Sequence, residues 1–184
     1  MPELTTPFII SQILVFGTIL LDFFSFQFKE KKKIMLCLIV SSCLVATHYF
    51  LLDQLSSGVM VCFSVLRFIT AYFSTNKKWA LFFISLNTIS LFFTYQAPLD
   101  LLFYVGLTIF IIGNFQKNDK SMRKLMMCGT SIAVLYNILI PSPMGALEEA
   151  IFLMSNFIGY WRFYIRKQKE DNKDIYIAKQ PKKK

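Results

Sequence analysis

Polar side chains interrupt the long apolar segments of this chain at a few positions, and those positions are the candidates for chemistry. Burying a charged side chain in hydrocarbon costs about 3 kcal/mol even on insertion scales. Each such residue is therefore expected to face protein or water and to have a partner. We predict that a substrate-binding set is formed by Asp22, His48, Arg67, Asn137, Glu149 and Asn156.

The expected depths of these side chains in a bilayer indicate two groupings. Asp22 and Arg67 lie roughly 6 and 10 Å from the basic ends of their segments at 1.5 Å per residue, which predicts an Asp22–Arg67 ion pair. His48 and Glu149 lie near the opposite ends and predict a second polar layer there. Each grouping also has a purely structural interpretation. The Asp22–Arg67 pair would then only hold helices together, and His48 would bond to a backbone carbonyl. Glu149 would be an acid favoured by a helix N-terminus.

The same residues indicate what a bound molecule would carry. Arg67 predicts a small polar or anionic solute with an anionic or hydrogen-bond-accepting group. His48 and Glu149 are candidates for carrying protons alongside it. An enzyme is not expected, because the chain has one histidine and four scattered cysteines, and the motifs GxSxG, HExxH and CxxC are absent from its sequence. We therefore expect no cofactor, no metal and no catalytic residue.

The composition predicts a lipid environment for the elements that position these residues. Of 184 residues, 55% are hydrophobic and 20 are Phe, which exceeds what the core of one soluble domain requires. A net charge of +9 can indicate nucleic-acid binding. We exclude that partner, because the basic residues fall in short breaks between apolar runs. The lipid bilayer is the expected partner, and a homo-oligomer is left open.

Seven apolar segments approach the roughly 20 residues that a helix needs to cross a bilayer core. Charge runs at 29–33 and 75–78, Pro98, and the two prolines at 141 and 143 separate them. In the sixth segment, Arg123 and Lys124 are expected to extend to the membrane interface. The sequence thus predicts an all-α membrane protein with seven transmembrane helices, at about 8–26, 34–52, 55–74, 79–95, 98–115, 125–140 and 145–164.

The distribution of basic residues predicts the orientation. Of the 20 lysines and arginines, 19 fall in alternate breaks or in the C-terminal region, and Arg67 is the exception. Cytoplasmic loops of membrane proteins carry such an excess, which places the N-terminus outside and the C-terminus in the cytoplasm. The segment 168–184 is charged and poor in apolar residues, so we predict a disordered cytoplasmic tail.

An internal repeat is indicated by a shift of 89 residues. It aligns Gly17 with Gly106 and the Phe-Gln pair at 26–27 with that at 115–116, and it also matches Ser41 with Thr130. The predicted organisation is a three-helix bundle at 1–76, a linker helix at 77–96 and a second three-helix bundle at 97–167. Two parallel repeats joined by one helix are typical of SWEET-type transporters, whose site lies between the repeats. Chance similarity between Phe-rich segments is the alternative.

Several short motifs resemble the YgjV family of small bacterial inner-membrane proteins. The resemblance extends over about 8–166 and implies an inner-membrane location, but it implies no substrate. A more distant resemblance to SWEET and PQ-loop proteins lacks their Pro-Gln signature. The residues that carry the YgjV resemblance are Gln12, Phe16-Gly17, the basic first loop, His48 to Leu52, Gly58, Arg67, Glu149 to Leu153, Asn156 and Arg162-Phe163.

Two function classes follow from these patterns. A small-solute transporter or facilitator predicts a polar cavity between the repeats, lined by Arg67 and Asn156. A non-transporting membrane receptor or assembly protein predicts a dry interface in which bulky apolar side chains meet. We expect the first.

Overall fold

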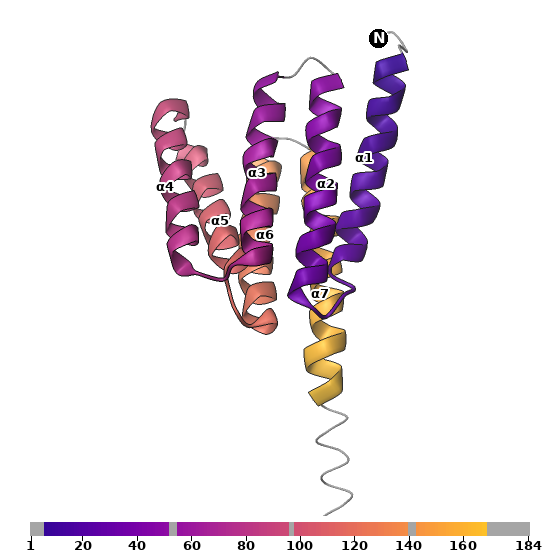
Figure 1. Cartoon of the computed structure of the whole chain (residues 1–184), viewed down its shortest axis with the longest axis vertical. Coiled ribbons are helices and arrows are strands. Elements are labelled where there is room, and N and C mark those ends of the chain that lie inside the picture. The colour runs from indigo at the N-terminus through magenta and orange to yellow at the C-terminus, as the bar shows by residue number, and fades with distance from the viewer. Residues whose placement is uncertain (1–5, 52–54, 96–97, 140–142, 169–184) are drawn as a thin grey trace, which may run out of the picture.

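The computed structural model describes residues 6–51, 55–95, 98–139 and 143–168, which form seven α-helices packed side by side without a strand in those ranges (Figure 1). The predicted all-helical fold class is confirmed. The helices are α1 (Thr6–Ser25), α2 (Lys31–Leu51), α3 (Leu55–Phe73), α4 (Lys77–Thr94), α5 (Pro98–Asn114), α6 (Asp119–Leu139) and α7 (Pro143–Tyr160).

The helix starts follow local chemistry. The side chains of Asn76 and Asn118 accept hydrogen bonds from the backbone N–H groups of Lys78 (3.0 Å) and Lys120 (2.8 Å), at the starts of α4 and α6. Both α5 and α7 begin with a proline, which suits the first helical turn because its missing N–H would have no partner there. At its far end α7 continues into a π-helical segment, Trp161–Arg166.

The helices pack in two groups. The most extensive contacts join α1 to α2 and α2 to α3 in one group, and α5 to α6 and α6 to α7 in the other. The α4 helix packs on α5, and α1 contacts α7 (Figure 1). A small-residue contact brings α5 and α6 together, because a Cβ atom on Gly129 would lie 2.7 Å from the carbonyl oxygen of Gly106.

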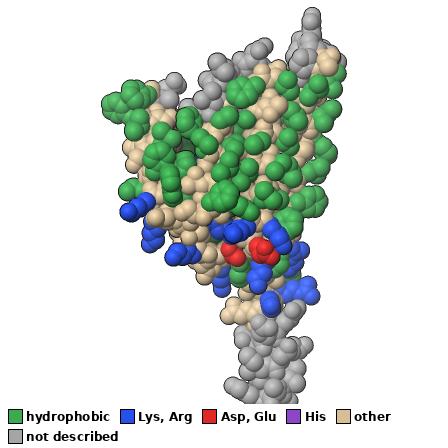
Figure 2. Space-filling view, viewed as in Figure 1, with side chains coloured by type: hydrophobic (Ala, Val, Ile, Leu, Met, Phe, Trp, Pro, Cys, Tyr) green, Lys and Arg blue, Asp and Glu red, His purple; other side chains and the backbone are tan. Residues whose placement is uncertain are grey.

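The apolar core lies at one end of the bundle, where the α1–α2 and α5–α6 connections meet. Its fully or almost fully buried side chains include Phe26, Ile34, Met35, Phe115, Met122 and Met126. On the face shown in Figure 2, basic side chains gather at this end, and hydrophobic side chains cover the bundle above it. We call it the basic end.

The outer surface of the bundle carries many large apolar side chains. Phe73, Phe92 and Phe93 are each about 80% exposed, and many other large apolar side chains face outward. Within the described ranges, no helix combines the length and hydropathy of a membrane-crossing segment.

The basic end differs from the sequence prediction at the start of the sixth helix. The sixth helix begins at Asp119, earlier than the expected 125, and Arg123 is 0% exposed. The prediction that Arg123 extends to the interface is therefore wrong, because its guanidinium turns inward to backbone carbonyls. The predicted tail, 168–184, lies outside the described residues except for Gln168.

Candidate functional site

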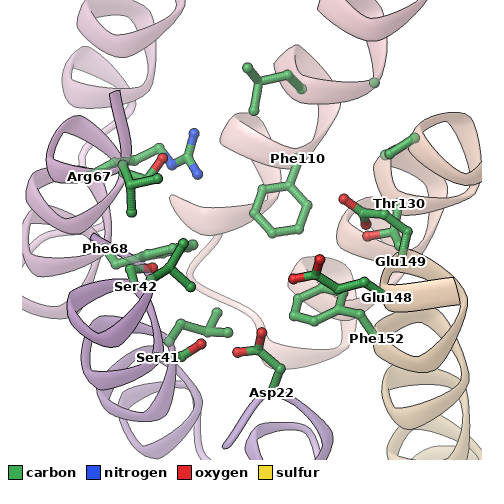
Figure 3. A pocket seen from close by; sticks show the side chains of 18 of the residues that line it. Asp22, Ser41, Ser42, Arg67, Phe68, Phe110, Thr130, Glu148, Glu149 and Phe152 are labelled. Carbon is green, nitrogen blue, oxygen red and sulfur yellow. The ribbon is translucent and has the colours of Figure 1, made fainter. Parts of the chain in front are cut away.

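A cavity of about 330 Å³ opens between the two helix groups. Six helices line it, and α4 contributes no residue. The volume lies at the lower end of the range of about 300–1,000 Å³ found for ligand pockets, which suits a metabolite-sized molecule. Its polar and charged lining residues are Asp22, Ser41, Ser42, Ser64, Arg67, Thr130, Glu148 and Glu149 (Figure 3).

Arg67 forms one wall of the cavity. It comes from α3 and is 8% exposed. Its guanidinium carbon lies 5.0 Å from the ring centroid of Phe68 and 5.7 Å from that of Phe110, so two aromatic faces hold it in a cation–π arrangement. Its Nε atom is buried and makes no hydrogen bond. Arg67 is thus held by aromatic rings while part of its donor capacity is unused.

Three carboxyl groups stand across the cavity from Arg67. Glu148 and Glu149 come from α7, and Asp22 comes from α1 (Figure 3). Although both are described and both line the cavity, Asp22 and Arg67 form no ion pair. The predicted pair is wrong because α2 packs between α1 and α3. The Ser41 hydroxyl points toward the Asp22 carboxylate instead (Figure 3).

The other three predicted site residues do not line the cavity. His48 Nδ1 lies 3.1 Å from the carbonyl oxygen of Ser11, which ties α2 to α1. Asn137 donates to the carbonyl of Ala133 in its own helix (2.9 Å). Asn156 is fully buried at the basic end. The structure therefore groups Asp22, Arg67 and Glu149, and it separates His48, Asn137 and Asn156 from them.

Five polar lining residues were absent from the predicted set: Ser41, Ser42, Ser64, Thr130 and Glu148. Ser41 and Thr130 both face the cavity, and the shift of 89 residues pairs them, so the internal repeat could have identified them. Glu148 precedes the predicted site residue Glu149 in the sequence. Both lie near the start of the same helix, and that position alone gave no reason to include Glu148 in the predicted site. The Thr130 hydroxyl is buried without a hydrogen-bond partner.

A second polar cluster joins the two helix groups at the basic end, and we call it the seam. Arg123 of α6 donates to the carbonyl oxygens of Phe26 (3.0 Å) and Phe28, just after α1, and to Asn156 Oδ1 of α7 (3.4 Å). Asn156 in turn donates to the Arg123 carbonyl (3.1 Å). Carbonyls at a helix C-terminus carry partial negative charge, which favours a buried cation there. The members of the seam are Phe26, Phe28, Lys31, Gln116, Arg123, Asn156 and Gly159.

Lys31 makes the reciprocal contact of the seam. It begins α2, and its Nζ donates to the carbonyl of Gln116, just after α5 (2.9 Å). Each helix group therefore supplies a cation that caps a helix C-terminus of the other.

Comparison with known proteins gives one family and no individual relative. No curated protein matches the chain, and no solved structure does. A family described as bacterial inner membrane protein matches residues 9–167, which is most of the chain. The chain therefore belongs to the Imp-YgjV family of bacterial inner membrane proteins.

Proposed function

We propose that this protein is a multi-pass inner-membrane transporter or facilitator for a small polar solute. The observation that carries the proposal is the cavity between the two helix groups, in which Arg67 faces three carboxyl groups. Such a charged lining is costly inside a membrane protein unless it serves a ligand or ion. In the proposed plan, α1–α3 and α5–α7 are two parallel three-helix repeats, α4 is the linker, and the solute passes between them.

The lengths of the helices and their exposed apolar side chains support the membrane-spanning part of the proposal. Its helices have 17–21 residues, which is about 26–32 Å at 1.5 Å per residue and matches a hydrocarbon core of about 30 Å. Exposed phenylalanines would face lipid tails there. The basic end would then lie in the cytoplasm, consistent with the family's inner-membrane location.

The proposed orientation predicts where the chain's two ends lie. A reporter that is active only in the periplasm should work at the N-terminus, and one active only in the cytoplasm should work at the C-terminus. Exchanging the reporters is the control, because each should then be silent. Two ends that report from the same side would contradict seven crossings.

Transport itself is testable with purified protein in liposomes. We expect uptake of at least one solute from a panel of labelled metabolites, and a roughly tenfold or larger loss of that uptake in Arg67→Ala, because the buried cation is lost from the pathway. Lys124→Ala is the matched control, since it removes an exposed cation from α6. A protein that moves no solute in the panel, or whose uptake is indifferent to Arg67→Ala, would contradict the proposal.

The alternative is a non-transporting receptor or assembly protein. It predicts a dry apolar interface between the helix groups. The eight polar or charged residues in the cavity lining favour transport over that alternative.

A further inference from the structure

The charges in the cavity narrow the class of solute. Arg67 alone would suit a solute with an anionic or hydrogen-bond-accepting group, as expected from the sequence. Asp22, Glu148 and Glu149 line the same cavity, and their carboxylates would repel an anion that carries no positive group (Figure 3). A ligand that satisfies both sides carries a positive group as well as a negative one.

Unpartnered polar atoms mark where such a ligand would bind. Arg67 Nε, Asp22 Oδ1 and Thr130 Oγ1 are buried and make no hydrogen bond. Buried polar groups in proteins are paired as a rule, and each exception calls for an explanation. Here an unused donor stands on one side of the cavity and an unused carboxylate oxygen on another. The two are supplied by α3 and α1, so one molecule between the helices can meet both.

The remaining walls of the cavity are apolar. Side chains from both helix groups form them, among them Leu38, Phe68, Leu107, Phe110 and Phe152. A molecule with only charged groups would leave this surface uncovered. The lining is therefore complementary to a compact molecule with a charged head and an apolar body.

We infer that the cavity binds a zwitterion of the neutral amino-acid class, with its carboxylate on Arg67, its ammonium on the carboxyl groups of Asp22 and Glu149, and its apolar side chain against the phenylalanine rings. This inference rests on the proposed function, because it names the solute of the same site. It narrows the small polar or anionic solute expected from the sequence to one that carries both an anionic and a cationic group.

Binding to the detergent-purified protein tests this inference apart from transport. The probes are apolar amino acids, each compared with the carboxylic acid that lacks its amino group and the amine that lacks its carboxylate. We expect the amino acids to raise the melting temperature at saturating concentration. Each single-charge analogue should bind roughly ten- to a hundredfold more weakly, since it leaves one charged partner unmatched.

Two substitutions test which protein side chain binds each charged group of the amino acid. Arg67→Gln should reduce discrimination against the amine, and Glu149→Gln should reduce discrimination against the carboxylic acid. Glu30→Gln, at an exposed glutamate, is the matched control and should leave both unchanged. The comparison of probes on the unaltered protein stands even where a variant fails to fold.

The outcomes separate the inference from the proposed function. Equal binding of acid and amino acid, equal binding of amine and amino acid, or no binding of any amino acid would each overturn the zwitterion. If liposomes still take up another solute, transport stands without it. Binding of amino acids without any uptake would keep the ligand class and contradict transport.

Discussion

Replacing Arg123 with leucine should lower the melting temperature of the protein sharply. The substitution leaves the carbonyl oxygens of Phe26 and Phe28 and the side-chain oxygen of Asn156 without this donor, at a site where Arg123 is 0% exposed. Each buried acceptor left unpaired costs about 1–3 kcal/mol. We expect a loss of about 3–5 kcal/mol in total, the range seen when one partner of a buried charged network is removed.

Lys124→Leu provides the control for this substitution. Lys124 is the next residue of α6 and is exposed, so its replacement should change the melting temperature little. Tryptophan fluorescence during heating of the detergent-purified protein gives both values. Arg123→Lys should fall between them, because an ammonium keeps the charge but loses the planar pair of donors. Equal melting temperatures for Arg123→Leu and Lys124→Leu would show that the seam does not hold the bundle together.

The seam also bears on how the proposed transport would work. The cavity lies above the apolar core, and that core fills the basic end with Phe26, Ile34, Phe115 and Met122. Lys31 and Arg123 lock the same end by capping helix C-termini across the two groups. A solute that leaves the cavity toward this end would have to pass both layers. In the proposed transport cycle, the contacts of the seam are therefore the ones that would break and re-form.

Helix positions could be predicted from the sequence because their signals are local. The apolar lengths, the charge runs and the prolines that start α5 and α7 all act within a few residues. The predicted boundaries lie within a few residues of the observed ones, apart from the early start of α6. That start was missed because Arg123 is charged, and charge next to an apolar segment usually indicates an interface.

Side-chain partners could not be predicted in the same way. Depth along a helix placed Asp22 and Arg67 at similar levels, but depth does not say which helix lies between them. Arg123 was not predicted to be buried because its partners are mostly backbone carbonyls. Every residue has a backbone carbonyl, so the residue types do not reveal such a contact. Asn156, which the shift of 89 residues aligns with Arg67, was expected to line the cavity, whereas in the structure it bonds to Arg123 at the basic end.

Gly17 and Gly159 differ in the space around them: an added Cβ atom fits at Gly17 and does not fit at Gly159. Gly17 in α1 has room, because an added Cβ would lie 3.6 Å from Leu44 Cδ1, an ordinary contact. Gly159 in α7 has none, because an added Cβ would overlap the carbonyl oxygen of Phe26 and lie 2.6 Å from Arg123 Nη1. The carbonyl belongs to the backbone after α1 and cannot rotate away.

Gly159→Ala should therefore destabilise the protein while Gly17→Ala does not. Alanine is favoured over glycine inside a helix by about 1 kcal/mol, so Gly17→Ala should be neutral or stabilising. At Gly159 that gain is outweighed by overpacking, which typically costs 1–3 kcal/mol, and by displacement of the Arg123 hydrogen bond to Phe26. Melting temperatures of the two variants, measured side by side in one detergent, decide the matter. If Gly159→Ala melts at or above the unaltered protein, α7 does not cross the end of α1 as closely as the seam requires.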